Sequence, residues 1–205
     1  MKKIFPIVAI SLLLASFFFS SCDDKRVLPI FGEREYKNGD TIYQTIPDFS
    51  FINQDSQTVT QNDYKGKIYV SDFFFTHCPT ICPRVKKNML RILAKYKDNP
   101  NVLLLSHSID PKHDTVGRLK EYASKLDISA PKWNLVTGDK AKIYDIAFYY
   151  ASVAKESPDA PGGFDHSGYI VLVDKNRRVR AAVDGTIDDA VTKFLDDIDI
   201  LLSEK

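Results

Sequence analysis

The sequence predicts an α/β protein with a central mixed β-sheet, in which strands and amphipathic helices alternate along one domain. Short runs rich in β-branched and aromatic residues occur at 68–75, 102–108 and 133–137, and apolar residues at helical spacing follow each run. The chain has 205 residues and 44% hydrophobic content, enough to bury one ordinary core. A hairpin near the C-terminal end gives the sheet both parallel and antiparallel strands.

Each element is predicted from a local pattern. Residues 47–60 alternate between apolar and polar around a turn at 53–55, which indicates an N-terminal β-hairpin. Further strands are expected at 68–75, 102–108, 133–137, 169–173 and 179–183, and helices at 80–97, 115–126, 140–150 and 187–202. Residues 157–164 hold two prolines and two glycines, and we expect a functional loop there.

The first 45 residues precede the predicted domain, which covers 46–205. Residues 1–22 have a basic start, an apolar middle and small residues before Cys22, the layout of a secretory signal. Because a cysteine stands where cleavage would fall, we expect a lipoprotein signal in which Cys22 becomes the acylated N-terminus. An uncleaved membrane anchor is the alternative. Residues 23–45 show no sustained period and are expected to be an irregular linker, so that the protein is exported and tethered to a membrane of the cell envelope.

The charge balance gives no indication of a nucleic-acid partner. The whole chain has a formal net charge of +1, and loss of Lys2 and Lys3 with the signal lowers it to −1. Proteins that bind nucleic acid through phosphates usually carry a marked basic excess.

The chemistry is expected where the 68–75 strand ends. Cys78 and Cys82 follow the strand directly, and Pro83 belongs to the first turn of the next helix because proline has no N–H to donate deeper inside one. Unpaired N–H groups and the positive end of the helix dipole favour a thiolate there and lower the thiol pKa. The two sulfurs are therefore expected to be nucleophiles or metal ligands.

Three interpretations of the cysteine pair stay open from these residues alone. The first is a structural disulfide, which is common in exported proteins, although a bridge between residues four apart restrains little of the unfolded chain. The second is the redox-active pair of a thiol-disulfide enzyme. The third is a metal site in which the two thiolates are joined by another ligand from elsewhere in the chain.

Four histidines could supply that ligand. His77 adjoins the first cysteine, but adjacent side chains rarely aim at one point. His107 lies within a strand and is expected in the core, and His113 lies in a polar turn and is expected to be solvated. His166 follows the glycine-rich loop beside an acidic residue, which suits a ligand that moves inward; its position alone leaves structural and ligating roles equally open.

Four motifs together resemble those of the Sco/SenC family of copper-handling proteins, in order and in spacing. They are FTHCPTICP at 75–83, SIDP at 108–111, Trp133 with the Thr-Gly pair at 137–138, and DHS at 165–167. The likeness runs from about Pro47 to the last helix. The cysteine motif and the Asp-His-Ser triplet are specific in combination, whereas either alone would not be.

The resemblance implies a thioredoxin-like fold and a metallochaperone that delivers copper to the CuA site of cytochrome c oxidase. It also implies that Cys78, Cys82 and His166 bind the copper. Subunit II of the oxidase, or another copper-accepting envelope protein, would be the partner. The family's Cys-x-x-x-Cys replaces the Cys-x-x-Cys of thioredoxins, and residues 165–167 stand where thioredoxins usually place a cis-proline.

The donor types agree with this implication. Thiolates with imidazole suit copper in either oxidation state and also zinc, and the dithiol must be reduced before it can bind a metal. Asp72 is expected to be either a hydrogen-bonded strand carboxylate or a proton acceptor beside the site. Asp165 is expected to orient His166 through the second ring nitrogen. The alternative function is a membrane-tethered thiol-disulfide oxidoreductase that reduces client cysteines and needs no histidine.

Overall fold

The computed structural model describes residues 26–204, and the predicted signal with Cys22 lies outside this range. Its strands are β1 (Arg34–Lys37), β2 (Asp40–Tyr43), β3 (Ser50–Asn53), β4 (Thr58–Thr60), β5 (Ile68–Phe74), β6 (Val102–Ser108), β7 (Trp133–Thr137), β8 (Ala154–Glu156), β9 (Phe164–His166), β10 (Tyr169–Val173) and β11 (Val179–Asp184). Its helices are α2 (Cys82–Tyr96), α3 (Val116–Lys125), α4 (Lys140–Tyr149) and α5 (Asp188–Ser203), with short 3-10 turns at Gln61–Tyr64 and Pro161–Gly163. Among these helices, none has both the length and the hydropathy that crossing a bilayer requires.

A seven-stranded mixed sheet forms the centre of the molecule, as predicted. Its order is β11-β10-β5-β6-β7-β3-β4. The inner pairs β5 with β6 and β6 with β7 are parallel, whereas β10 and β3 join them antiparallel from either side. The expected N-terminal hairpin is present as β3 and β4, which form one edge of this sheet.

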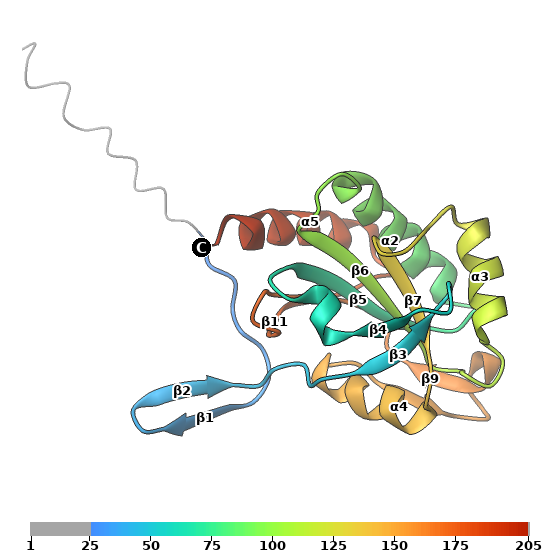
Figure 1. Cartoon of the computed structure of the whole chain (residues 1–205), viewed down its shortest axis with the longest axis horizontal. Helices are drawn as coiled ribbons and strands as arrows, with labels where there is room; N and C mark the ends of the chain where they lie inside the picture. The colour runs from blue at the N-terminus through green and yellow to red at the C-terminus, as the bar shows by residue number, and fades with distance from the viewer. Residues whose placement is uncertain (1–25, 205) are drawn as a thin grey trace, which may run out of the picture.

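Helices cover both faces of the sheet, with α2 and α5 on one side and α4 on the other (Figure 1). Successive strand residues point to opposite faces. Phe74 packs on Tyr122 of α3 with ring centres 5.7 Å apart, and the preceding Phe73 packs at the same distance on Tyr150, which follows α4. Every residue of β5, β6 and β7 is therefore buried, which explains why these strands have continuous apolar runs.

The cysteine turn differs slightly from its prediction. Helix α2 begins at Cys82 rather than near Thr80, with Ile81 as its N-cap and Pro83 in the first turn. The turn that precedes it is closed by the Cys78 N–H, which donates to the Phe75 carbonyl at 3.3 Å. Cys82 thus lies in the first helical turn and Cys78 just before the helix, as the sequence predicted.

Two antiparallel hairpins were not predicted. The segment expected to be an irregular linker contains β1 and β2, and the expected loop at 157–164 is largely the tip of a hairpin formed by β8 and β9. These strands have only three or four residues and are mostly exposed. They therefore lack the alternation of apolar and polar residues by which half-buried strands are recognised.

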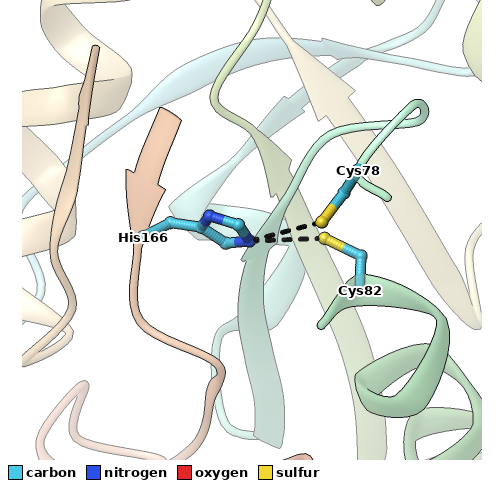
Figure 2. A group of neighbouring side chains, drawn as sticks. All are labelled: Cys78, Cys82 and His166. Carbon is cyan, nitrogen blue, oxygen red and sulfur yellow. Dashed lines mark hydrogen bonds between the residues drawn. The ribbon is translucent and has the colours of Figure 1, made fainter. Parts of the chain in front are cut away.

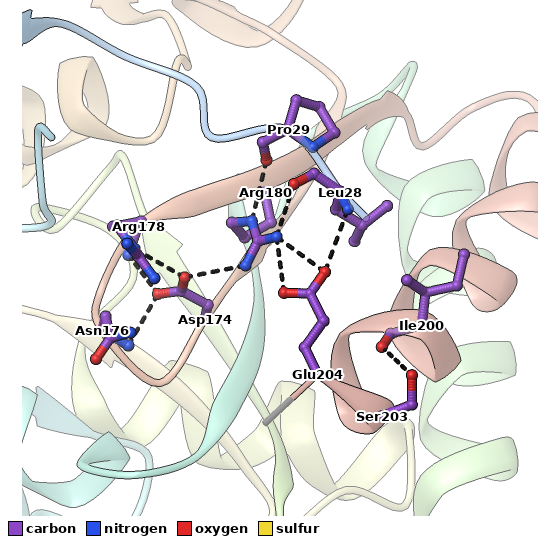
Figure 3. A network of polar contacts seen from close by, with 9 residues as sticks. All are labelled: Leu28, Pro29, Asp174, Asn176, Arg178, Arg180, Ile200, Ser203 and Glu204. Carbon is purple, nitrogen blue, oxygen red and sulfur yellow. Dashed lines mark hydrogen bonds and ion pairs between the residues drawn. The ribbon is translucent and has the colours of Figure 1, made fainter. Parts of the chain in front are cut away.

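A buried arginine fastens the N-terminal segment to the domain (Figure 3). Arg180 on β11 donates to the carbonyl oxygens of Leu28 and Pro29 at 2.7 and 3.0 Å. The same guanidinium pairs with Asp174 at 3.3 Å and with Glu204, beyond α5, at 2.8 Å. One side chain therefore connects the start of the described chain, the sheet and the C-terminal end.

We expect Arg180→Ala to lower the free energy of unfolding by about 3 kcal/mol, because it leaves the buried Asp174 carboxylate with only the more exposed Arg178 as its cation and removes the hydrogen bonds to the N-terminal segment. Urea unfolding measures this change. Arg178→Ala is the matched control, since Arg178 pairs with the same carboxylate from a more exposed position and should cost less than about 1 kcal/mol. If both variants lost the same free energy of unfolding, the buried Arg180 would not stabilise the protein more than the more exposed Arg178 does.

Candidate metal centre

The three residues that the resemblance implies as copper ligands meet at one end of the central sheet (Figure 2). Cys78 lies in the turn after β5, Cys82 is the first residue of α2, and His166 is the last residue of β9. The hairpin β8–β9 brings the imidazole to the cysteines from a position 84 residues beyond Cys82 in the sequence.

The donor atoms have the separations that a single metal ion requires. Nε2 of His166 lies 3.4 Å from Sγ of Cys82 and 3.9 Å from Sγ of Cys78. An ion with bonds of about 2.3 Å to sulfur and about 2.0 Å to nitrogen holds those two donors about 3.5 Å apart in tetrahedral geometry. All three atoms lie within 4.8 Å of one another. The arrangement could accept an ion with little movement, although the role of each residue as a ligand stays a prediction.

Both cysteines are free thiols of unequal exposure. Cys82 is only 3% exposed, Cys78 is 8% exposed, and His166 is half-buried. Three protein donors fill fewer positions than a closed structural site with four, so the exposed side stays available to a further ligand.

The two thiols also differ in pKa, in opposite directions. The hydrogen bond from Cys82, assisted by one from His166, outweighs burial and lowers the pKa of Cys78 to about 3. The contact with Cys78, together with burial, raises the pKa of the Cys82 thiol above its ordinary value. The pair thus shares one proton, with a thiolate at the more exposed sulfur and a thiol at the deeper one.

Phe75 and Gly162 hold the histidine hairpin against the cysteine turn. The Phe75 ring contacts the imidazole of His166 edge-on at 5.2 Å and packs on Phe164 at 5.0 Å. Gly162 has a φ of +78° and lies so close that an added Cβ would come within 2.8 Å of the Phe75 ring. Only glycine can adopt this backbone conformation and also lie this close to the Phe75 ring, which explains why a glycine occurs in the stretch before His166.

Asp72 matches the first of its two predicted alternatives, a hydrogen-bonded strand carboxylate. It is fully buried, forms an ion pair with Lys86 at 2.8 Å and accepts a hydrogen bond from the hydroxyl of Ser106. The indole N–H of Trp133 donates to the same hydroxyl at 2.9 Å. The carboxylate is therefore engaged within the core, and a part for it in proton transfer at the site stays a prediction.

Sequence reasoning missed Lys86. Four residues after Cys82, it shares a face of α2 with that cysteine, and its charge acts to lower the thiol pKa as one of the weaker influences on it. The sequence did hold a signal, because Lys86 lies on the apolar side of an amphipathic helix. A charge buried at such a position needs a partner of opposite charge, and Asp72 is that partner.

The structure gives Asp165 a different partner from the one predicted. Its carboxylate pairs with Lys155 across the β8–β9 hairpin at 3.3 Å, and both side chains are exposed. Within residues 26–204, no hydrogen bond joins Asp165 to His166. An orienting role for Asp165 stays a prediction.

The other histidines lie outside the three-donor cluster. His107 is buried in the core, as predicted, where it stacks on Phe73 at 4.7 Å and desolvation lowers its pKa to about 3. His113 is exposed, as predicted, and His77 points to Asp110 rather than to the thiols.

Comparison with known proteins agrees with the motifs. A curated relative, the SCO1 protein homolog of Bacillus subtilis, is 27% identical over 161 residues, which cover 78% of this chain and 83% of the relative. Among the rickettsial SCO2-like proteins, that of Rickettsia conorii is 34% identical over 136 residues, and this chain spans 64% of its length.

Solved structures agree in fold. A SCO1/SenC family lipoprotein from Bacillus anthracis is 28% identical with a TM-score of 0.71, over 78% of this chain and 96% of that one. BsSco, a member of the Sco family of cytochrome c oxidase assembly proteins in which a disulfide switch was identified, is 27% identical with a TM-score of 0.69, over 78% and 95%. Copper-bound ScoI of Bradyrhizobium japonicum is 29% identical with a TM-score of 0.59, over 75% and 98%.

These likenesses confirm the thioredoxin-like fold that the resemblance implied. The SCO1/SenC family model matches residues 38–199, which include the whole cysteine turn, the β8–β9 hairpin and most of α5. Because that match covers well over half of the sequence, the chain belongs to the SCO1/SenC family.

Proposed function

We propose that this protein is a copper metallochaperone, which holds copper at Cys78, Cys82 and His166 and delivers it to the CuA site of cytochrome c oxidase. The observation that carries the proposal is the convergence of two sulfurs and one imidazole nitrogen at separations of 3.4 and 3.9 Å. Soft donors of this kind suit copper, and the copper-bound relative from B. japonicum supports that choice over zinc.

The difference in pKa between the two thiols favours the binding of copper. Cys78 provides a thiolate at neutral pH, so the first Cu–S bond needs no deprotonation. Bonding of the second sulfur releases the proton held on Cys82, since only a thiolate ligates. His166, carried on a short exposed hairpin, completes the set and is the donor that an incoming ligand of an acceptor protein replaces most readily.

The redox state of the pair controls this loading. If Cys78 and Cys82 are oxidised to a disulfide, two electrons and the one proton that the reduced pair shares must be returned before the sulfurs can bind copper. The dithiol is therefore both the copper site and its switch, and the disulfide switch described for BsSco supports this part of the proposal.

We infer that the protein acts in the cell envelope, anchored by a lipid on Cys22 with residues 1–22 removed as a signal. The B. anthracis lipoprotein supports this inference. The partner that receives copper is then subunit II of cytochrome c oxidase or another copper-accepting envelope protein. Residues 23–45 would connect the anchor to the domain at 46–205, with the β1–β2 hairpin as part of that connection.

A second candidate function is thiol-disulfide exchange, favoured by the low pKa of Cys78 at a helix N-terminus. The Cys78 thiolate would attack a client disulfide and form a mixed disulfide. Cys82 would then displace the client, which leaves as a dithiol while Cys78 and Cys82 become oxidised. Reduction of a disulfide-containing peptide by the metal-free protein tests this function, and inertness of the peptide would exclude it.

Substitution of the histidine tests the copper site. We expect His166→Ala to weaken copper binding by the reduced, untagged protein more than about 100-fold, beyond the effect usual for a group that only supports a ligand. The thiolate-to-copper absorption should also change. Asp165→Asn is the comparison variant, because its carboxylate pairs with Lys155: unchanged readings would exclude the predicted orienting role of Asp165, and a smaller loss than that of His166→Ala would support it. If His166→Ala kept the parent affinity and absorption, the histidine would not be a ligand.

The pH dependence of alkylation tests the shared proton. Because the pKa of Cys78 is lowered to about 3, its thiolate should persist as the pH falls from about 8 to about 4 and be lost only as the pH approaches that pKa. Iodoacetamide should therefore modify Cys78 before Cys82 at about pH 5. Mass spectrometry of timed samples measures both rates.

In the same experiment, Cys82→Ser should move the Cys78 profile to higher pH, since the contact with Cys82 is the largest cause of its low pKa. Protein unfolded in urea should give the ordinary thiol profile near pH 8.5. A folded protein that followed the unfolded profile would refute the shared proton.

A further inference from the structure

We propose that the protein has a second metal site, formed by His77, Asp110 and His113, which binds a divalent transition-metal ion such as Cu(II) or Zn(II). None of these side chains takes part in the cysteine site. His77 precedes Cys78 in the sequence, yet its imidazole faces the carboxylate of Asp110. The inference goes beyond the proposed copper delivery and does not depend on it.

The three potential donors already surround one small volume. Nδ1 of His113 lies 2.6 Å from Oδ2 of Asp110, and Nε2 of His77 lies 3.6 Å from the same oxygen. One donor atom from each residue lies within 4.8 Å of the other two. Around an ion with bonds of about 2.0 Å, tetrahedral donors stand about 3.3 Å apart, so entry of the ion requires the His113 imidazole to retreat by less than about 1 Å.

The two imidazoles converge on the carboxylate instead of packing flat on each other. Their rings lie 5.7 Å apart and nearly perpendicular, at 83°. In the absence of an ion, His113 can donate its Nδ1 proton to Asp110, which provides a simple hydrogen-bonded alternative. The His77 contact at 3.6 Å is too long for such a bond, and an ion between the two groups would account for its direction.

The fold buries one donor and leaves the other two exposed to solvent. The Asp110 side chain is only 4% exposed, and the Asp110 carbonyl accepts hydrogen bonds from the N–H groups of His113 and Asp114. The side chains of His77 and His113 are 42% and 61% exposed. A buried carboxylate therefore anchors the site, while the imidazoles can adjust to an ion that arrives from solvent and retains water as further ligands.

The donor types separate this site from the cysteine site. Two imidazoles and a carboxylate suit Cu(II), Zn(II) and Ni(II), and the usual order of affinities places Cu(II) first among the divalent ions. Cu(I) prefers thiolates, which are absent from the three residues proposed here. The chain would thus hold a soft ion at the buried site and a divalent ion at the exposed one.

One aromatic ring separates the two sites. The centre of the Phe75 ring lies 4.9 Å from that of the His77 ring and 5.2 Å from that of the His166 ring, and both pairs meet edge-on. Since His77 and Cys78 are consecutive, an ion at either site would restrain the same turn.

The test uses the full chain, without a histidine tag, in which Cys78→Ser and Cys82→Ser have removed the sulfur donors. We expect this double variant to bind one Cu(II) or one Zn(II) per chain in equilibrium dialysis with metal analysis. The EPR spectrum of bound Cu(II) should show splitting from nitrogen ligands. Adding His77→Asn or His113→Asn should weaken binding at least about tenfold and reduce the splitting. His166→Asn in the same background is the matched control and should change neither.

Several outcomes would overturn the proposal. They are a dissociation constant weaker than about 0.1 mM for both ions, binding that survives both histidine substitutions, and binding that is lost with His166→Asn. His77 and His113 are exposed, so their variants should fold, and an unchanged thermal midpoint verifies this. Failure of the parent protein to hold Cu(I) would refute the proposed function alone, because the double variant tests the second site without the cysteines.

Discussion

The packing of the Phe75 side chain is the constraint on which this end of the molecule depends. The ring is fully buried and contacts residues from both segments that carry donors, namely His77 in the cysteine turn and His166 in the β8–β9 hairpin. Gly162 lets the hairpin approach the ring closely enough for His166 to reach the sulfurs. A hydrophobic contact thus determines the geometry of a polar site.

The hydrogen bond between the two sulfurs, together with burial, then determines how charge is distributed over them. The deeper thiol of Cys82 keeps its proton because that proton forms the hydrogen bond to Cys78, and because ionisation there would also cost desolvation and place two negative sulfurs in contact. Lys86 lies near enough to oppose this, but its charge is already paired with Asp72 in the core. The ion pair therefore weakens the effect of the Lys86 charge on Cys82, and the two sulfurs together hold one negative charge and one proton.

The elements that could be predicted from the sequence are those whose burial requires a run or a periodic pattern of apolar residues, and the exposed elements without such a pattern were missed. Strands β5, β6 and β7 are covered on both faces and could be recognised from apolar runs, whereas the small exposed hairpins β1–β2 and β8–β9 could not. The resemblance supplied Cys78, Cys82 and His166 as a set. No local pattern could give their separations, because these result from closure of the fold across 84 residues. The direction of His77 was equally hidden, since it depends on where the turn after β6 places Asp110.

The contrast between the two clusters follows from where each lies relative to the ring of Phe75. On one side two buried sulfurs and a half-buried imidazole come together, a set of donors that suits a soft ion such as copper. On the other side two exposed imidazoles face a single buried carboxylate, and water can reach these donors. Consecutive residues at 77 and 78 contribute to opposite sides of the ring although the chain turns there, where the Cys78 N–H donates to the Phe75 carbonyl at 3.3 Å. A single turn can therefore present two chemically different sets of donors without mixing them.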